Sequence, residues 1–571
     1  MDFRRKKIRL GDALVSDGVI TEEQLQKYLE KQRTSNKKLG ELLIDEGVVS
    51  EEIIAKTLSN QLGYAMIENL EECNISDDIL SLVPVNVIQK YSVMPVEYSP
   101  ESPNILRLAM IDPQNLNAID DVALITNLEI EPVISTTKSI NMTIDKYFGR
   151  QEIDSKLDEY TKGKEEEEEE DEYADDINNS PIVQLVTTMI DSAVRQRASD
   201  IHIEPLEKSV RIRYRIDGTL YERATYSHKI LNAIVARIKI IGGMDIAEKR
   251  KPQDGRITQV VDRMEYDIRV SVLPTVYGEK IVMRLTSKTA LTKDKKDLGF
   301  TPTELKTFDH IISNPHGILL VTGPTGSGKS TTLYTALSEL NSSEVNIITV
   351  EDPVEANIDG INQVQTNNKA NLTFASALRS ILRQDPDIIM VGEIRDAETA
   401  QIAVQASITG HLVVSTVHTN SSAATITRLE DMGIESYLLA DSITGIIAQR
   451  LVRRLCPSCK ETRLATDVEM KLLGHPGEKP RKICVPHPGG CSRCGGTGYY
   501  GRIGIYEIME MTSHLKEIVS KSLGTKELED EAKKEGLRTL RDNAAEYVLE
   551  GVTSIQEMLK VATVETDDIV L

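Results

Sequence analysis

Apolar residues near the start of the chain recur at helical spacing and in two copies. Residues 9–32, RLGDALVSDGVITEEQLQKYLEKQ, return 29 residues later as residues 38–61, KLGELLIDEGVVSEEIIAKTLSNQ. In each copy, leucines four residues apart predict one apolar helix face and a glycine ends that helix. Thr21 or Ser50 then begins a second helix, with Glu close behind as a capping partner. The pattern predicts a tandem repeat of helical hairpins over residues 1–62.

The pattern changes after this repeat and changes again before the middle of the chain. Residues 63–150 mix short strand-like segments, such as NILRLAMID, with helix starts, so we expect a small α/β domain. Asp112 and Asn115 lie in a turn that can close over the repeats, although a helix N-cap is the simpler explanation. Residues 151–177 contain the run EEEEEED, which cannot bury apolar area and predicts a mobile acidic linker.

Residues 178–290 begin as an amphipathic helix and continue as strands, which predicts an α+β domain. Arg211, Arg213 and Arg215 alternate along one of these strands, so their side chains share one face. Three cations on one face require anions nearby, and a solvated strand face is the plain alternative. Arg256, in the segment QDGR, adds a fourth candidate for contact with an anionic ligand.

A glycine-rich segment within residues 291–571 carries the clearest chemistry. An apolar run at 318–321 precedes GPTGSGKST and a helical pattern follows it, which is the strand, loop and helix order of a phosphate-binding loop. Glycines let backbone N–H groups face phosphate oxygens, Lys329 supplies charge to the β- and γ-phosphates, and Ser330 can ligate Mg²⁺. The residues predicted to bind ATP in this loop are Gly323, Pro324, Thr325, Gly326, Ser327, Gly328, Lys329, Ser330 and Thr331.

Three further apolar segments end in polar side chains, within VNIITVEDPVE, DIIMVGEIRD and HLVVSTVHTN. They bring Glu355, Glu393 and His418 to the edge that holds the phosphate loop, because carboxyl ends of parallel strands meet at one edge of a sheet. Glu393 occupies the place where P-loop enzymes hold Mg²⁺ with an acidic residue. Either Glu355 or Glu393 can orient the attacking water, since phosphoryl transfer needs positioning more than a strong base.

Four of the six cysteines form two C-x-x-C pairs that are 31 residues apart and flanked by glycines. Thiolates at such spacing predict one structural, tetrahedral Zn²⁺ site with no open position for water. Cys73 and Cys484 have no partner motif, and we expect each to be a small buried residue. The four predicted zinc ligands are Cys456, Cys459, Cys491 and Cys494.

Composition narrows the classes of function. With no Trp and 5 Phe, the chain predicts aliphatic cores, and its length predicts roughly three to five domains. A formal net charge of −22 argues against a surface that grips nucleic acid. No uncharged apolar run reaches the length of a membrane span or of a signal peptide core, so we expect a cytoplasmic protein.

The order of these motifs resembles the Walker A, Asp-box, Walker B and His-box series of the secretion and pilus motor ATPases. The resemblance implies a multidomain α/β fold with a RecA-like P-loop ATPase core, an α+β second N-terminal domain and Mg²⁺-dependent ATP hydrolysis. The residues that it assigns to catalysis are Lys329, Glu355, Glu393, His418, Arg213, Arg215 and Arg256. Ser330 and Glu393 hold Mg²⁺ on this reading. Further arginines expected at the nucleotide are Arg379, Arg383, Arg395 and Arg502.

The tandem repeat resembles the N-terminal cyclic-di-GMP-binding module of some of these ATPases, whose motifs begin R/K-L-G and end in Gln. Arg9 can form a bidentate contact with guanine or phosphate, and Gln32 can pair with a base edge. Lys38 replaces arginine in the second copy, which is expected to weaken one half-site. A docking module without a ligand is the alternative. The residues assigned to cyclic-di-GMP are Arg9, Leu10, Gly11, Gln32, Lys38, Leu39, Gly40 and Gln61.

The resemblance implies a homohexamer that works on an inner-membrane platform protein and extends a type IV pilus or a type II secretion pseudopilus. Three alternatives stay open. A retraction motor is disfavoured because such motors generally lack the long N-terminal region and the four-cysteine insertion. A DNA-translocating ATPase is disfavoured by the acidic charge and by the absence of a base-stacking aromatic series. A scaffold that senses cyclic-di-GMP and ATP without catalysis is disfavoured by the intact phosphate-loop motifs.

Overall fold

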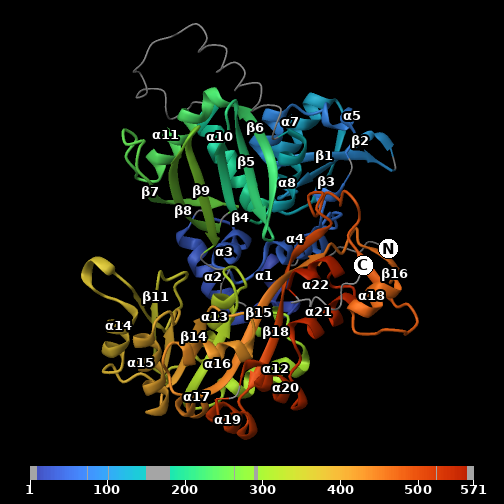
Figure 1. Ribbon diagram of the computed structural model, residues 1–571. Helices are drawn as coiled ribbons and strands as arrows, with labels where there is room; N and C mark the ends of the chain where they lie inside the picture. The colour runs from blue at the N-terminus through green and yellow to red at the C-terminus, as the bar shows by residue number, and fades with distance from the viewer. Residues whose placement is uncertain are drawn as a thin grey trace. The chain divides into compact units, whose positions relative to one another are not determined.

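The computed structural model divides into two compact units, Met1–Leu285 and Thr286–Leu571 (Figure 1). Its described residues are 9–35, 37–73, 75–100, 102–148, 181–262, 264–287, 294–522 and 524–561. The predicted acidic linker lies outside them.

The helices of the first unit are α1 Leu10–Ser16, α2 Glu22–Thr34, α3 Leu39–Asp45, α4 Glu51–Leu62, α5 Asp77–Leu80, α6 Val85–Tyr91, α7 Leu116–Thr126, α8 Thr137–Phe148, α10 Pro181–Arg195 and α11 Leu231–Ile241. Its strands are β1 Val93–Ser99, β2 Ser102–Met110, β3 Glu129–Ile134, β4 Ala198–Pro205, β5 Ser209–Ile216, β6 Thr219–Ser227, β7 Gln253–Val261, β8 Met264–Thr275 and β9 Gly278–Ser287. Short 3-10 helices occur at η1 Leu70–Glu72 and η2 His228–Ile230.

The tandem repeat forms the two predicted helical hairpins, α1 with α2 and α3 with α4. Gly18 and Gly47 end the first helix of each copy in left-handed backbone, with φ of 71° and 69°. Thr21 and Ser50 cap α2 and α4 through their hydroxyl groups, as predicted. The reciprocal partner of Thr21 is Gln24 and not a glutamate.

The repeats pack against each other through their Leu-Gly pairs. A Cβ added to Gly11 would lie 3.2 Å from Leu39 and 2.5 Å from Leu25, and one added to Gly40 would lie 3.4 Å from Leu10. Leu10 faces Gly40 as Leu39 faces Gly11, so the two copies exchange leucines across their contact. Glycine lets the helices approach closely there.

The segment after the repeats is a small α/β domain with the sheet order β1-β2-β3. Strands β1 and β2 are antiparallel, and β2 and β3 are parallel. The predicted helix start at Asn115 is confirmed, since its side chain accepts a hydrogen bond from the backbone N–H of Ala118.

The rest of the first unit is built on a six-stranded sheet with the order β6-β5-β4-β9-β8-β7. Alternation along β5 buries Val210, Ile212, Tyr214 and Ile216 on one face, where they join α10 and α11 in the core. The three alternating arginines of β5 therefore lie on the opposite face, as predicted.

The helices of the second unit are α12 Pro302–Ile312, α13 Lys329–Leu340, α14 Phe374–Ile381, α15 Ala397–Ile408, α16 Ser422–Asp431, α17 Ser436–Ser442, α18 Asp467–Leu472, α19 Ser513–Ser520, α20 Thr525–Lys534, α21 Leu540–Leu549 and α22 Ile555–Val561. Its strands are β10 Gly317–Thr322, β11 Ile347–Glu351, β12 Asn362–Gln365, β13 Ile388–Val391, β14 Leu412–Val417, β15 Ile443–Leu455, β16 Glu461–Leu464, β17 Lys482–Val485 and β18 Tyr499–Glu510. Short 3-10 helices occur at η3 Lys295–Asp297 and η4 Asn368–Ala370.

The core of this unit is a seven-stranded sheet with the order β12-β11-β13-β14-β10-β15-β18. Neighbouring strands are parallel except for the pair β15 and β18, which are antiparallel. Strand β10 lies between β14 and β15 and is buried along its whole length. A largely parallel sheet of buried strands with flanking helices agrees with the predicted RecA-like fold.

The long strands β15 and β18 were not predicted from the pattern. They lie side by side in Figure 1 and frame the segment that carries the hairpin β16–β17 and the cysteines. After β18 the described chain continues as four helices, α19, α20, α21 and α22. In the part of the chain that the structure describes, no helix is both long and apolar enough to span a membrane.

Candidate ATP site and associated binding centres

The predicted catalytic groups of the second unit follow neighbouring parallel strands. The phosphate loop follows β10, His418 follows β14, Glu393 follows β13, and Glu355 comes shortly after β11. Because these strands run in one direction, their carboxyl ends meet at one edge of the sheet. The predicted edge is therefore formed.

The phosphate loop depends on glycine at two positions. Gly323 has φ of 150°, and a Cβ there would lie 2.5 Å from the carbonyl oxygen of Gln449. Gly328 is the N-cap of α13 with φ of 90°. The loop thus leads directly into a helix N-terminus, whose free N–H groups and dipole favour phosphate.

Lys329 is the first residue of α13 and is buried. Its Nζ donates to the carbonyl oxygens of Gly323 (2.8 Å) and Pro324 (3.1 Å), so the ammonium is held inside the loop. Burial lowers the pKa of Lys329 to about 8, and the charges of Glu393 and Arg450 act in opposite directions on it. A cation removed from water in this way gains more from an anionic ligand than an exposed lysine does.

Glu393 joins the residues of the β13 and β14 edge. Its carboxylate contacts the Arg395 guanidinium and lies 3.3 Å from Nε2 of His418. The Glu393 side chain is 13% exposed, so it is shielded without being closed off from a ligand. Thr416 Oγ1 donates to the Gly392 carbonyl (2.8 Å), which ties the two strand ends together.

The carboxylates at the end of β11 and shortly after it have different hydrogen-bond partners. Glu351 is buried and accepts hydrogen bonds from Tyr334, Thr349 (2.6 Å) and Gln363 (3.1 Å). The backbone N–H of Glu355 donates to the hydroxyl of Tyr334 (3.2 Å). Glu351 is therefore a structural residue of the strand end, and its network fixes the backbone that carries Glu355.

The four arginines predicted at the nucleotide have different surroundings. Arg395 contacts Glu393, whereas Arg379 pairs with Glu398 (2.6 Å) and Arg383 donates to the Arg379 carbonyl (2.8 Å). Arg502 lies opposite Arg453 in the β15–β18 ladder. Arg395 thus contacts the predicted catalytic residue Glu393.

Two residues of β15 lie against the phosphate loop and were missed by the sequence reasoning. Gln449 accepts a hydrogen bond from Thr332 Oγ1 of α13 (2.8 Å), and its Nε2 would lie 2.9 Å from a Cβ at Gly328. Arg450 Nη1 would lie 3.1 Å from a Cβ at Gly323. The sequence feature that could have indicated these two residues is a polar pair within the otherwise apolar segment IIAQRLV. This pair points to the phosphate loop only once β15 is known to pair with β10.

The arginine face of the first unit is a network and not a row of free cations. Glu204 lies between Arg211 (3.1 Å), Arg213 (2.7 Å) and Lys280 (3.3 Å). Asp200 lies 3.8 Å from Arg215 and 3.2 Å from Arg284. Two carboxylates face five cations in this network, so the face keeps an excess of positive charge.

Arg256 has a partner of its own on the β7–β8 ladder. Its Nε and Nη2 both donate to Asp267, with Nη2 at 2.7 Å from Oδ2. Arg269, directly opposite in the register, lies 4.0 Å from the same carboxylate. Arg269 was missed, although its alternation with apolar residues in EYDIRVSV places it on a strand face with Asp267.

The residues predicted to bind cyclic-di-GMP fall into two groups. Leu10, Gly11, Leu39 and Gly40 form the contact between the repeats, while Arg9 is exposed at the start of α1. Gln32 Nε2 donates to the carbonyl of Lys37 (3.4 Å), and Gln61 lies near the end of α4. Lys38 pairs with Asp112 of the small α/β domain (2.5 Å), so the turn at Asp112 does reach the repeats.

The four predicted zinc ligands converge, with all sulfur atoms within 4.8 Å of one another. The Sγ atoms of Cys456 and Cys491 are 3.7 Å apart, and those of Cys459 and Cys494 are 3.9 Å apart. Four sulfurs about 2.3 Å from one Zn²⁺ in a tetrahedron have edges of about 3.8 Å, whereas a disulfide needs about 2.05 Å. The cluster therefore has the dimensions of a Zn²⁺ site.

The backbone around the cluster favours thiolate. Cys494 Sγ accepts hydrogen bonds from the N–H groups of Cys491 (3.1 Å) and Gly498 (3.2 Å). Burial raises the pKa of Cys494, but these donors outweigh it and leave a pKa of about 7. Cys484 lies outside the cluster, 3.6 Å from Thr462 Oγ1.

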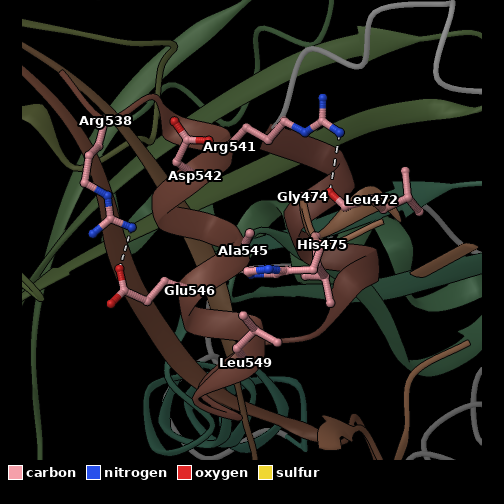
Figure 2. Close-up of a pocket in the computed structure, with 10 residues that line it drawn as sticks. Leu472, Gly474, His475, Arg538, Arg541, Asp542, Ala545, Glu546 and Leu549 are labelled. Carbon is pink, nitrogen blue, oxygen red and sulfur yellow. Dashed lines mark hydrogen bonds and ion pairs between the residues drawn. The ribbon is translucent and has the colours of Figure 1, made fainter. Parts of the chain in front are cut away.

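A pocket of 440 Å³ lies between α21 and the end of α18 (Figure 2). Arg538 pairs with Glu546 across one side (2.5 Å), and Arg541 donates to the Leu472 carbonyl on the other (3.4 Å). The lining mixes both charges with leucines and contains none of the predicted site residues. It is separate from the ATP site in its residues and in its chemistry.

Comparisons with known proteins agree with this geometry. A family model described as "Type II/IV secretion system protein" matches residues 175–560, more than half of the chain, and one described as "MshEN domain" matches residues 62–154. The latter begins where the tandem repeat ends.

Two relatives and one solved structure illustrate the match. "Type IV pilus assembly ATPase PilB" of Myxococcus xanthus is 44% identical over 561 residues, covering 96% of this chain and 98% of that protein. "Type II secretion system ATPase E" of Vibrio cholerae is 46% identical over 411 residues, covering 72% of this chain and 81% of that protein. The Yersinia pseudotuberculosis ATPase DotB, 21% identical with a TM-score of 0.51, covers 69% of this chain and 97% of that chain and shares the fold.

The sheet edge thus carries a phosphate loop, two acidic residues and a histidine, and a family model matches most of the chain. The chain belongs to the type II/IV secretion system protein family and is a pilus assembly or secretion ATPase.

Proposed function

We propose that the chain is a homohexameric motor that hydrolyses ATP to extend a type IV pilus from an inner-membrane platform protein. The observation that carries the proposal is the convergence of Lys329, Glu393, His418 and Glu355 on one edge of the sheet. These are the groups that phosphoryl transfer needs, namely a phosphate cation, metal and water ligands, and a contact for the transferred phosphate.

The residues divide the chemistry among them. Lys329 and the N–H groups of the loop bind the phosphates. Ser330 and Glu393 would hold Mg²⁺, which would neutralise phosphate charge. The Glu393 carboxylate fits such a site because it is an oxygen ligand of the kind Mg²⁺ prefers and its side chain stays 13% exposed at the sheet edge. Glu355 then orients the attacking water, and His418 contacts the γ-phosphate.

Pilus assembly is preferred to secretion because of the length of the match. The similarity to the M. xanthus pilus assembly ATPase extends over 98% of that protein, and the similarity to the V. cholerae secretion ATPase leaves more than a quarter of this chain unmatched. The extension of a secretion pseudopilus is the nearest alternative.

The cysteine cluster is proposed to hold one Zn²⁺. Four thiolate ligands close the coordination shell, so the metal supplies folding energy to the insertion and takes no part in hydrolysis.

Cyclic-di-GMP is proposed to bind the tandem repeat and to regulate the motor. Contacts inside the first unit support a route for the signal. Glu51 of α4 accepts from the backbone N–H of Thr137 (2.9 Å) at the start of α8, and Asp145 of α8 pairs with Arg195 of α10 (2.7 Å). Helix α8 thus touches both the repeat and the arginine-bearing domain.

ATP turnover tests the catalytic part of the proposal. Lys329→Ala abolishes ATP turnover. Glu393→Gln slows turnover by several orders of magnitude while nucleotide stays bound, because the variant loses stabilisation of charge in the transition state but keeps its affinity for nucleotide. Glu517→Gln, which alters an exposed acid paired with Lys521 near the end of α19, serves as the control and keeps turnover. Wild-type turnover in the double variant Glu393→Gln with Glu355→Gln would end the motor interpretation.

A further inference from the structure

Glu507 is a buried carboxylate with no place in the catalytic scheme above. It lies on β18 and is 5% exposed. Its Oε1 accepts hydrogen bonds from the backbone N–H (2.8 Å) and the hydroxyl (2.5 Å) of Ser422, and its Oε2 accepts from the backbone N–H of Leu540 (3.4 Å). Ser422 begins α16 and Leu540 begins α21, so one carboxylate serves two helix starts.

The first of these helix starts is continuous with the catalytic edge. Ser422 comes directly after the segment 418–421, which leads from His418 to α16. Within it, Thr419 Oγ1 donates to the Ser421 carbonyl (3.3 Å). The backbone N–H of Thr419 donates to Thr322 Oγ1 (2.9 Å), and that hydroxyl lies 3.1 Å from the Thr419 carbonyl. Thr322 is the residue before Gly323, so the segment 418–421 is fastened to the root of the phosphate loop.

Arg450 supplies a second connection to the same segment. Its Nη2 donates to the side-chain oxygen (3.2 Å) and the carbonyl (3.3 Å) of Asn420, and its Nη1 donates to the Gln449 carbonyl (3.1 Å). Burial lowers the pKa of Arg450, and the charge of Glu507 opposes that change. The segment 418–421 is therefore held from the loop side by Thr322 and from β15 by Arg450, while Glu507 of β18 holds Ser422, the residue that directly follows it.

We propose that Glu507 is a positioning residue for ATP hydrolysis, which holds the segment 418–421 so that His418 faces the γ-phosphate. The proposal rests on the role given to His418 above. A buried carboxylate is costly unless donors compensate it, and two of the three donors here belong to Ser422, the residue directly after the segment whose placement catalysis requires. The backbone N–H of Ser422 cannot leave Glu507 without displacing the residues that precede it.

The competing explanation is that Glu507 only stabilises two helix starts. Loss of a helix cap lowers the free energy of unfolding and does not change the rate of the chemical step. Positioning predicts a different pattern, because the segment 418–421 addresses the γ-phosphate and not the rest of the nucleotide. The two explanations separate in the ratio of kcat to KM and in ADP affinity.

The experiment uses the full chain with the variant Glu507→Gln, which keeps the side-chain shape and one oxygen acceptor but removes the charge. We expect kcat for ATP to fall at least about tenfold, while KM for ATP and the affinity for a fluorescent ADP analogue change less than about twofold. The control is Glu510→Gln on the same strand, whose carboxylate pairs with the exposed His310 (2.7 Å), and this variant keeps wild-type kinetics.

Three outcomes overturn the proposal. Folded Glu507→Gln with wild-type kcat does so, and so does a loss of ADP affinity as large as the loss of kcat. If Glu507→Gln does not fold, Ser422→Ala replaces it, because it deletes one donor to Glu507 and keeps the backbone; wild-type kcat in that variant refutes the link. His418→Ala distinguishes the proposed role of His418 from the proposed role of Glu507. Full turnover in His418→Ala refutes the role of His418 in hydrolysis. Impaired turnover in His418→Ala, together with full activity in Glu507→Gln, refutes only the positioning of His418 by Glu507.

Discussion

Lys38 Nζ lies 2.5 Å from Oδ2 of Asp112, so a residue that the repeat assigns to a dinucleotide forms an ion pair with the neighbouring α/β domain. The pair is a surface one, with side chains 72% and 37% exposed. A phosphate that approaches Lys38 meets this carboxylate as a competitor. On the proposed binding of cyclic-di-GMP to the repeat, the ion pair connects that binding to the contact between the repeat and the domain that follows it.

Removing the competitor is expected to strengthen ligand binding. Because an exposed ion pair contributes about 0.2–1 kcal/mol, Asp112→Asn should raise the affinity for cyclic-di-GMP by about 1.4- to 5-fold in calorimetry. Asp45→Asn is the matched control, since it frees the adjacent Lys37 from an equivalent pair (2.8 Å) and leaves affinity unchanged. Weaker binding by Asp112→Asn would show that the carboxylate belongs to the binding site.

The arginine face is expected to complete the ATP site of another subunit. Arg213 belongs to the first unit and Lys329 to the second. Mixing Arg213→Ala subunits with Lys329→Ala subunits should therefore restore part of the ATP turnover that each variant lacks alone. Arg211→Ala, which removes a different donor from the same Glu204, distinguishes a catalytic contact from a weakened network. Absence of recovery at every mixing ratio, in rings that exchange subunits, would place Arg213 at its own active site.

The cysteine cluster is expected to yield one Zn²⁺ per chain by elemental analysis of reduced protein that has met no chelator. Cys459→Ser should lose the metal and lower the unfolding temperature, because metal binding is coupled to folding. Cys484→Ser changes a cysteine of the same insertion that lies outside the cluster, and this variant should keep the metal and the wild-type unfolding temperature. Metal-free wild-type protein with unchanged stability would remove the zinc assignment.

Glu204 gives the arginine face a dependence on pH. Burial raises the pKa of Glu204, but hydrogen bonds from Arg213, Lys280 and Arg211 outweigh it and lower the pKa to about 2. A folded-state pKa below that of the unfolded chain stabilises the protein above the unfolded value, and this contribution is lost as pH falls through the folded value.

Calorimetric unfolding should therefore show Glu204→Gln to be less stable than wild type at pH 7, with a difference that shrinks from about pH 5 toward pH 2. Glu222→Gln, an exposed acid on β6 that contacts Thr225, should show no such trend. A stability difference that stays constant with pH would mean that lost packing, and not lost charge, explains the effect of Glu204→Gln.

The elements with local signals were predictable from the chain alone. The strand at residues 388–391 and the loop that starts at Gly323 depend on apolar runs and on glycine, which neighbouring residues determine. Their meeting at one sheet edge followed from the direction of parallel strands. Two contacts could not be predicted in this way, because each joins residues far apart in the sequence. They are the ion pair of Lys38 with Asp112 and the approach of Arg450 to the phosphate loop. Only the paired strands β10 and β15 bring Arg450 to its place.

The exchange of leucines between Gly11 and Gly40 bears on how this module is recognised across genomes. The close contact between the helices requires the Leu-Gly pair in this chain, so a sequence search weighted on that pair would select for the double hairpin and not for nucleotide binding. On the proposed cyclic-di-GMP assignment, the information that discriminates lies in the polar ends of each copy, Arg9, Gln32, Lys38 and Gln61. A sequence classifier scored on those four positions would separate modules that bind cyclic-di-GMP from modules of the same fold that do not.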